Sequence, residues 1–329
     1  MKIVLDGPIG RRGAPTIRQR FGGRATLLEL ADDEAPAERA AKLAEAEVLI
    51  GMRFDKTLPP TPRLRLLQLA VSGLDLVDLS AVPAGVAVCN VYEHGTSISE
   101  YVLAAMLHWT LELARRDAAF KAGSWSEGPH MGGPMRGELA GKTVGLVGYG
   151  NIGRAVAERA RAFGMRIEAL TRTPRPIAPR ADWLGGYGDL MRLLANADFL
   201  VIACPLDVAT RGLIDAKAFA AMKPEAVLIN IARGPIVAED ALYAALAERR
   251  IAGAVLDVWY QYVERDKPDI RPSRHPFHAL ANVVMTPHIG GWTEGQQSRR
   301  WAKIVENLQR WLDGKELLNQ VHPLPPAAP

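Results

Sequence analysis

The sequence contains very little cysteine and has no long apolar run. Cys89 and Cys204 are the only cysteines among 329 residues, and both lie inside apolar stretches. This count excludes a disulfide framework and a cysteine-based metal cluster, so we expect reduced, buried thiols. No apolar run approaches the roughly 18 residues of a transmembrane helix, and the opening residues MKIVLDGPIG lack the pattern of a signal peptide. We therefore expect a cytoplasmic protein that does not bind membranes.

An excess of charge of one sign is also missing. Lys and Arg number 40 against 36 Asp and Glu, and the basic pairs, such as Arg115-Arg116 and Arg299-Arg300, are far apart along the chain. Such charges form a solvated surface and not a stripe for nucleic acid. The histidines show no metal-ligand spacing to acids or cysteines. We expect no nucleic-acid partner and no metal site.

What is present is a glycine-rich turn between a strand and a helix. The apolar run from Val144 to Val147 fits a strand buried on both faces of a parallel sheet. The motif G-x-G-x-x-G follows at once, and apolar residues then recur at helical spacing. The motif glycines are Gly148, Gly150 and Gly153, and the residues between them are Tyr149, Asn151 and Ile152. This order of strand, turn and helix predicts a site for the diphosphate of a dinucleotide at the helix N-terminus.

The rest of the chain predicts an α/β fold with about two domains. Short apolar runs alternate with helical segments on both sides of the glycine turn. They predict strands at Ile3–Leu5, Ala25–Leu30, Val48–Gly51, Leu66–Ala70, Ala87–Cys89, Ile167–Leu170, Phe199–Ala203, Ala226–Asn230, Gly253–Val258 and Val283–Thr286. The helix Trp301–Trp311 is expected to return to the first domain. The expected domains are therefore 1–96 plus 290–329 for substrate and 97–289 for the dinucleotide, with a disordered tail VHPLPPAAP.

One long helix, Ser97–Lys121, is expected to leave the first domain. The residues that follow it, Gly123–Gly141, are rich in glycine and proline and carry Trp125 and two methionines. They are too irregular for a helix or strand. We interpret this arm as a contact with a second subunit; a loose loop is the alternative.

Polar residues follow three of the predicted strands in the dinucleotide domain. Arg233 comes after the strand that ends at Asn230, Asp257 lies at the end of the next, and His288 follows the last. Ligands bind at the carboxyl ends of such strands. A histidine there can protonate the alkoxide that hydride transfer to a ketone would leave, and an arginine can hold a carboxylate. These residues predict hydride transfer to a 2-oxo acid.

The motifs LVGYGNIGRAVA, NIARGPIVAEDAL, GAVLDVW and NVVMTPHIGG resemble the D-isomer-specific 2-hydroxyacid dehydrogenase family in order and interval. The resemblance implies two Rossmann-like parallel-sheet domains, one flavodoxin-like and one dinucleotide-binding, with a cleft between them. It also implies a homodimer and NAD(P)-linked reduction of 2-oxo acids. Arg233 then binds substrate and His288 is the acid/base. The turn Val71-Ser72-Gly73 receives the substrate carboxylate.

The resemblance also implies the residues that contact the cofactor. Asp257 lies near the nicotinamide amide, and the chain after Ala203 passes under the adenosine and diphosphate. Beyond the glycine turn, the expected contacts are Thr171, Arg172, Cys204, Pro205, Thr210, Ile231, Ala232, Asp257 and Gly290.

Two positions depart from the family pattern. The family pairs its histidine with a glutamate, and Tyr262 stands at that place. Either Glu264, in a longer segment, replaces that glutamate as a catalytic carboxylate, or the histidine has no acidic partner and Gln261 or Tyr262 orients its ring. The glutamate at about 20 residues from the glycine turn, Glu168, lies inside a strand.

The second departure concerns the cofactor's ribose. The strand that contains Glu168 ends in Thr171-Arg172-Thr173, which offers no acid to the ribose 2′-hydroxyl. Arg172 and Arg175 would attract a 2′-phosphate, so we favour NADP(H), with NAD(H) possible. The alternative is that both arginines point into solvent.

The sequence therefore predicts an NADP- or NAD-dependent 2-oxo acid reductase acting on a small acid such as glyoxylate or hydroxypyruvate. A second hypothesis is a catalytically weak NAD(P)-binding regulator, which loss of the glutamate would permit. A related dehydrogenase that oxidises phosphite or formate is the third and ranks lowest, because formate oxidation leaves no proton for His288 to relay.

Overall fold

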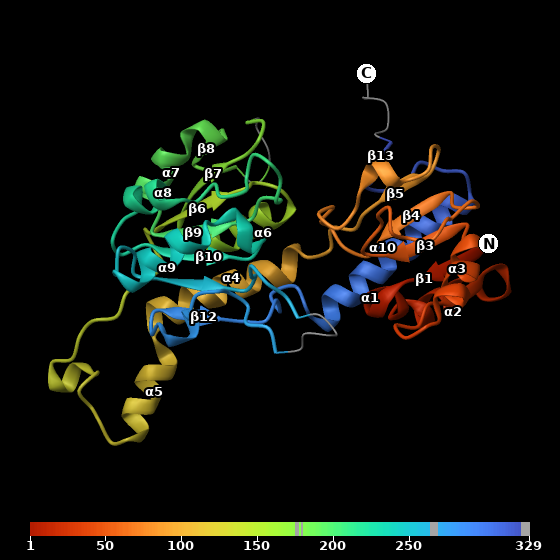
Figure 1. The fold of residues 1–329 in the computed structure, drawn as a ribbon. Coiled ribbons are helices and arrows are strands. Elements are labelled where there is room, and N and C mark those ends of the chain that lie inside the picture. Colours follow the sequence, from red (N-terminus) through yellow and green to blue (C-terminus); the bar gives the residue numbers. More distant parts are fainter. Residues whose placement is uncertain (175–177, 179, 264–268, 324–329) are drawn as a thin grey trace. The chain divides into compact units, whose positions relative to one another are not determined.

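The computed structural model describes residues 1–174, 178, 180–263 and 269–323, which fold into two compact units (Figure 1). The first unit combines Met1–Glu93 with Glu294–Pro329, and the second is His94–Thr293. Each unit is built on a parallel sheet with helices packed against it. The predicted α/β class with two parallel-sheet domains is confirmed.

The first unit has a six-stranded sheet in the order β13-β5-β4-β3-β1-β2. The strands are β1 (Lys2–Leu5), β2 (Thr26–Glu29), β3 (Val48–Gly51), β4 (Leu66–Leu69), β5 (Ala87–Cys89) and β13 (Gln320–His322). All neighbours run parallel except β13, which is antiparallel to β5. The prediction of a disordered tail was therefore wrong for Val321 and His322, which form an edge strand. The rest of that tail lies outside the described residues, except Pro323.

Both ends of the chain build the core of the first unit. Its helices are α1 (Gly7–Arg11), α2 (Ala14–Phe21), α3 (Pro36–Ala44) and α10 (Glu294–Leu312). Helix α10 packs against α2 so closely that a Cβ on Gly13 would lie 2.0 Å from the ring of Trp301. The strands β3 and β4 are buried at every position. Their continuous apolar runs therefore reflect burial on both faces of the sheet.

The second unit has a seven-stranded, fully parallel sheet in the order β12-β11-β10-β9-β6-β7-β8. The strands are β6 (Thr143–Val147), β7 (Arg166–Leu170), β8 (Trp183–Gly185), β9 (Phe199–Ile202), β10 (Val227–Asn230), β11 (Gly253–Leu256) and β12 (Val283–Met285). The chain enters the sheet at the interior strand β6, proceeds to β7 and β8 on one side, and then returns to β9 on the other side of β6. This doubly wound order places the topological switch point at the carboxyl end of β6.

Helices cover both faces of this sheet. One face packs against α4 (Gly95–Leu111) and α6 (Asn151–Ala162). The other packs against α7 (Leu190–Asn196), α8 (Ala216–Ala221) and α9 (Glu239–Ala247). The sheet is therefore buried on both sides, and only its edges and strand ends are open to ligands.

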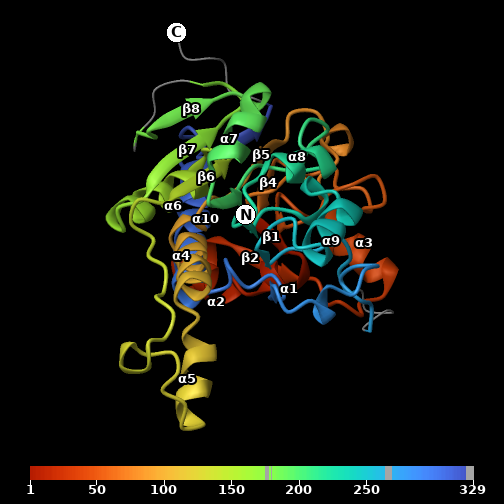
Figure 2. The ribbon, with the colours of Figure 1, turned by 90° about the vertical axis from the view of Figure 1, so that its left-hand side faces the viewer.

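The predicted single helix Ser97–Lys121 is wrong, because α4 ends at Leu111 and α5 (Leu113–Lys121) begins after it. Glu112 separates the two helices with a φ of 49°. Its carboxylate lies 2.9 Å from Arg115, which also binds Glu127. No glycine or proline marks the break, so the helical pattern could not reveal it. Helix α5 and the loop after it project from the unit (Figures 1 and 2).

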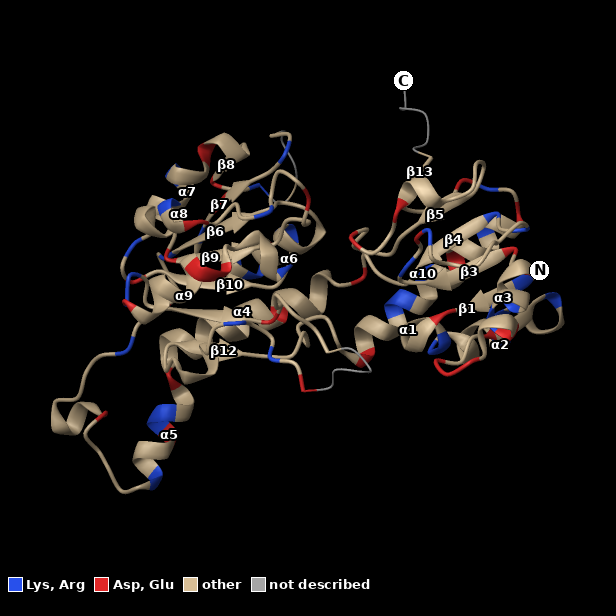
Figure 3. Ribbon diagram, in the orientation of Figure 1, with Lys and Arg blue, Asp and Glu red and all other residues tan. Residues whose placement is uncertain are grey.

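Charged residues are scattered over both units (Figure 3). They do not gather into a single-sign stripe on any element of the drawn ribbon. Among the residues that the structure describes, no helix is both long and apolar enough to cross a membrane. No group of His, Cys, Asp or Glu in the described ranges has the arrangement of a metal site.

Candidate active site

The glycine turn after β6 has the geometry that a dinucleotide requires. Gly148 has a φ of 110°, and a Cβ there would lie 2.6 Å from the backbone N of Cys204. A Cβ on Gly153 would lie 2.2 Å from the carbonyl O of Gly148. A Cβ on Gly150 would meet no protein atom within 4 Å. Two glycines are thus required by the fold, while the third leaves open space at the N-terminus of α6, the part of a helix that favours anions.

The first turn of α6 supplies donors for an anion. Gly150 is its N-cap, and Asn151 and Ile152 are its first helical residues. Backbone N–H groups in a first turn have no partner within the helix. The Tyr149 side chain is buried, which raises the pKa of its hydroxyl. The predicted cofactor residues Gly148 to Gly153 therefore lie together, with the backbone facing the open space.

The segment after β9 is a rigid turn beside these glycines. Thr210 is fully buried, and its hydroxyl donates to the carbonyl of Pro205 at 2.7 Å and accepts from the N–H of Asp207 at 2.8 Å. Burial raises the pKa of the Cys204 thiol to about 12. Cys204, Pro205 and Thr210 thus contribute shape to this wall and no reactive group.

The end of β7 is less free of acids than its sequence indicates. Arg172 lies 2.5 Å from a carboxylate oxygen of Asp207, which follows β9. Because β7 and β9 flank β6 in the sheet, this ion pair spans the strand end that carries the glycine turn. The prediction that the strand end Thr171-Arg172-Thr173 offers no acid to the ribose stays a prediction, and the fold adds Asp207 as a carboxylate beside Arg172. Arg175 lies outside the described residues.

Arg233 is held by a loop that is fixed at both sides. The buried Asn230 side chain accepts from the N–H of Ala232 at 3.1 Å and donates to the carbonyl of Arg233 at 3.1 Å. A Cβ on Gly234 would lie 2.4 Å from the carbonyl O of Trp259. The R-G sequence thus places a half-buried cation at the carboxyl edge of the sheet, where glycine is needed for a neighbouring backbone to pass.

Asp257 organises the turn that carries His288. Its buried carboxylate accepts from the hydroxyl of Thr286 at 2.6 Å and from the N–H groups of Ile289 and Gly290, both at 2.8 Å. These bonds surround His288, whose φ is 60°. Left-handed backbone at a non-glycine residue is uncommon and is held by its surroundings. Asp257 is therefore the anchor of the histidine turn.

Tyr262 lies against the imidazole. Its hydroxyl is 3.0 Å from Nδ1 of His288, and it accepts from the N–H of Trp259 at 3.2 Å. The indole of Trp259 donates to the carbonyl of Thr286 at 2.9 Å. One of the alternatives predicted from the sequence, a ring oriented by Tyr262, thus has its hydrogen bond. The other candidate, Glu264, lies outside the described residues.

The predicted carboxylate turn Val71-Ser72-Gly73 belongs to the first unit and follows β4. The side chain of Asn90 donates to the carbonyl of Ser72 at 2.8 Å and is itself buried. The turn is thus shaped from within its own unit. Its role toward a substrate stays a prediction.

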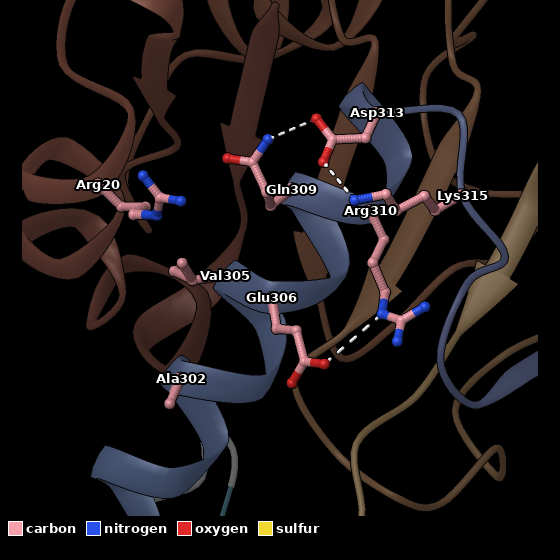
Figure 4. A pocket seen from close by; sticks show the side chains of 8 residues that line it. All are labelled: Arg20, Ala302, Val305, Glu306, Gln309, Arg310, Asp313 and Lys315. Atoms are coloured by element: carbon pink, nitrogen blue, oxygen red, sulfur yellow. Dashed lines mark hydrogen bonds and ion pairs between the residues drawn. The ribbon is translucent and has the colours of Figure 1, made fainter.

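A shallow hollow also lies along α10 in the first unit (Figure 4). Two ion pairs line it, Arg310 with Glu306 at 3.5 Å and Lys315 with Asp313 at 3.2 Å. Arg20 from α2 is a third cation of the lining, and exposed pairs of this kind contribute little binding energy. None of the site residues predicted from the sequence lines this hollow.

Residues 103–290 match the model of the family described as D-isomer specific 2-hydroxyacid dehydrogenase, NAD binding domain. The chain belongs to this family. A hydroxypyruvate reductase of Thermotoga maritima is 35% identical over 313 residues, which are 93% of this chain and 97% of the relative. A glyoxylate reductase of Thermococcus kodakarensis is 34% identical over 327 residues, 95% of this chain and 94% of the relative.

A solved structure shares the fold. The NADPH-dependent glyoxylate/hydroxypyruvate reductase of Sinorhizobium meliloti, in complex with NADP and malonate, matches with a TM-score of 0.76 at 26% identity and covers 98% of this chain and 96% of its own. The chain is therefore an oxidoreductase of the NAD(P)-dependent 2-hydroxyacid dehydrogenase family.

Sequence reasoning missed several residues of this family member's site. Asp207 forms the ion pair with Arg172, and the Thr286 hydroxyl donates to Asp257 in the histidine turn. Tyr101, which lies on α4, has its hydroxyl 2.6 Å from that of Thr286. Only Thr286 had a signal, because it stands between a predicted strand and Pro287. The other two come from distant parts of the chain and meet the site only through the fold.

Proposed function

We propose that this protein reduces a small 2-oxo acid of the glyoxylate or hydroxypyruvate kind with NADPH. The proposal rests on the residues found at the carboxyl edge of the second sheet. There a cation, Arg233, and an imidazole, His288, follow β10 and β12, and the glycine turn follows β6 of the same sheet. This is the edge at which doubly wound sheets bind nucleotides. The names of the relatives support the substrate class.

His288 is the proposed proton donor. When bound, the nicotinamide supplies the hydride that reduces the carbonyl carbon. The Nε2 of His288 gives a proton to the carbonyl oxygen, and in the reverse direction it takes the proton from the hydroxyl. Asp257 fixes the backbone just after His288. The imidazole is therefore already in place before proton transfer, and little conformational entropy is lost in the transition state.

Arg233 is the proposed clamp. Its planar guanidinium can bind the substrate carboxylate through paired hydrogen bonds and polarise the carbonyl. Backbone N–H groups of the turn Val71-Ser72-Gly73 are proposed to receive the same carboxylate. The first unit is accordingly proposed as the substrate domain and the second as the dinucleotide domain.

NADP(H) is the proposed cofactor, with NAD(H) as a weaker alternative. The strand end Thr171-Arg172-Thr173 contains no carboxylate to accept a ribose hydroxyl or repel a 2′-phosphate. Arg172 is more than half exposed, with 69% of its side chain accessible. Its bond to Asp207 is an exposed ion pair that contributes little, so the guanidinium can turn to a phosphate at small cost.

The arm Gly123–Gly141, together with helix α5 before it, is proposed to form a homodimer contact. Large apolar side chains are exposed along it, including Phe120, Trp125, Met131 and Met135. Phe120 and Trp125 pack edge to face with centroids 4.9 Å apart. Such a patch on a projecting segment fits burial by a second copy.

The two free cysteines support a reducing, cytoplasmic setting.

The test is oxidation of NADPH by a panel of 2-oxo acids, with His288→Ala compared to His278→Ala. His278 is an exposed histidine of the same unit and serves as the matched control. We expect His288→Ala to lower kcat by about a hundredfold or more while NADPH affinity is retained. Equal loss of turnover and of NADPH binding would contradict the role given to His288. A panel without turnover and with tight NADPH binding would favour the regulator hypothesis.

A further inference from the structure

The hydrogen bond between Tyr262 and His288 joins two groups that can each donate or accept. The Tyr262 oxygen is 3.0 Å from Nδ1, with the rings tilted by 50°. That oxygen already accepts the N–H of Trp259 at 3.2 Å. A tyrosine hydroxyl has one proton to donate and two lone pairs, so toward Nδ1 it can act as donor or as acceptor.

The tyrosine hydroxyl is held by a rigid frame. Trp259 is buried, and its indole is bonded to the carbonyl of Thr286 at 2.9 Å, on the strand side of the histidine turn. The Trp259 backbone passes so close to Gly234 that a Cβ on Gly234 would lie 2.4 Å from the carbonyl O of Trp259. The Trp259 N–H therefore fixes the place of the Tyr262 oxygen relative to the turn that carries His288.

We propose that Tyr262 is a positioning residue that holds His288 through a hydrogen bond whose direction is set by whether Nδ1 of the imidazole carries a proton. This inference rests on the proposed function of His288. In the charged ring, Nδ1–H donates to the tyrosine oxygen. In the neutral ring that carries its proton on Nε2, the tyrosine O–H donates to Nδ1. The ring orientation is kept in both states.

The proton balance of the reduction follows from this arrangement. The imidazolium gives its Nε2 proton to the carbonyl oxygen as a hydride reaches the carbonyl carbon, and the product is a 2-hydroxy acid. The imidazole that remains keeps Nδ1–H donated to Tyr262. A proton from solvent restores Nε2–H. Only the charged ring has a proton of suitable acidity, so reduction requires it.

Other charged or titratable groups contact the turn that carries this ring or lie on the same sheet edge. Asp257 accepts from the N–H groups of Ile289 and Gly290, Tyr101 bonds Thr286, and the ring of His94 lies beside Gly291. Arg233 follows β10, and His288 follows β12, at the same edge of the sheet; β11 lies between these two strands. Glu264 and Asp266 lie outside the described residues. Tyr262 is a neutral partner, so a carboxylate in its place would stabilise the imidazolium and extend reduction to higher pH.

The kinetic test compares Tyr262→Phe, Tyr262→Glu and the control Tyr260→Phe across pH. Tyr260 also loses a hydroxyl bond in that control, one to the carbonyl of Val237 at 3.0 Å. Tyr262→Phe should lower kcat by about tenfold with the KM for NADPH unchanged. Tyr262→Glu should move the alkaline limit of reduction upward by about one pH unit or more. Glu264→Gln should leave the effect of Tyr262→Phe in place.

The inference is overturned if Tyr262→Phe matches the wild type in kcat and pH profile, or if Glu264→Gln lowers the alkaline limit of reduction and Tyr262→Phe does not. A second measurement is independent of turnover: ¹⁵N spectra of histidine-labelled protein, assigned with His288→Ala. The neutral His288 should carry its proton on Nε2 in the wild type, and this preference should be lost in Tyr262→Phe. An unchanged tautomer would refute the positioning role, whereas a silent substrate panel with the expected spectra would refute only the proposed reaction.

Discussion

Replacing Gly150 with alanine should separate cofactor binding from folding. The φ of Gly150 is −83°, which alanine adopts, and its added Cβ would meet no protein atom within 4 Å. Loss of glycine at an N-cap costs up to about 1 kcal/mol, and a less flexible unfolded chain offsets about 0.4–1 kcal/mol. The free energy of unfolding should therefore change by less than about 1 kcal/mol.

The same methyl group should weaken NADPH binding strongly. It occupies the space beside the first turn of α6, where the diphosphate would accept backbone N–H bonds. Hydrogen bonds to a charged group contribute about 1.5–3 kcal/mol each. Loss of one such bond raises the Kd for NADPH by about 10- to 100-fold.

Gly148→Ala and Gly153→Ala are the contrasting variants. Their Cβ atoms would lie 2.6 Å and 2.2 Å from backbone atoms, and Gly148 also has a positive φ. Overpacking of about 1–3 kcal/mol, with about 1–2 kcal/mol for the left-handed backbone of Gly148, should destabilise both. At about 2–4 °C per kcal/mol, the Tm should fall by several degrees.

The assay is a thermal melt without cofactor together with a fluorescence titration with NADPH. We expect Gly150→Ala to melt like the wild type and to bind weakly. Wild-type affinity in Gly150→Ala would refute the placement of the diphosphate at this turn. A large fall in its Tm would refute the open space inferred at Gly150.

Four further predictions follow from other parts of the structure. Arg172→Ala should lower the preference for NADPH over NADH, measured as a ratio of Kd values, by about tenfold; an unchanged ratio would contradict the cofactor proposal. Asp257→Asn should lower kcat by about tenfold or more, because an amide cannot accept all the bonds that hold the His288 turn, and wild-type kcat would refute that anchor. Burial raises the thiol pKa of Cys89 to about 11 and of Cys204 to about 12, so both should stay protonated and unreactive to a disulfide reagent at pH 8 until unfolding, and native labelling would contradict this. Trp125→Ser should shift a dimer toward monomer in light scattering, whereas an unchanged mass would exclude the arm as the contact.

Much of the fold was predictable because its signals are local. The buried strands β3 and β6 read as apolar runs, and the glycine turn combined strand, glycines and helix in one stretch. The break at Glu112 was not predictable, because it depends on a left-handed residue whose carboxylate pairs with Arg115 in the following helix. The edge strand β13 was missed for a related reason: its pairing with β5 is long-range.

The site was predictable in part for the same reason. Arg233, Asp257 and His288 each follow a strand, so the topology of a parallel sheet brings them to one edge. The partner of Arg172 was not predictable, because Asp207 reaches it across β6 from another strand end. The bond from Tyr262 to His288 depends on the path of the chain after β11, which no local pattern specifies.

The close passage of Trp259 over Gly234 has a consequence for exchanging parts of this enzyme. A side chain at position 234 would push away the very backbone that carries the tryptophan and, beyond it, Tyr262. The positions of the Arg233 guanidinium and the His288 imidazole therefore depend on the same contact between the arginine loop and the Trp259 backbone. Grafting the segment after β11 from a relative would succeed only when the arginine loop is transplanted along with it.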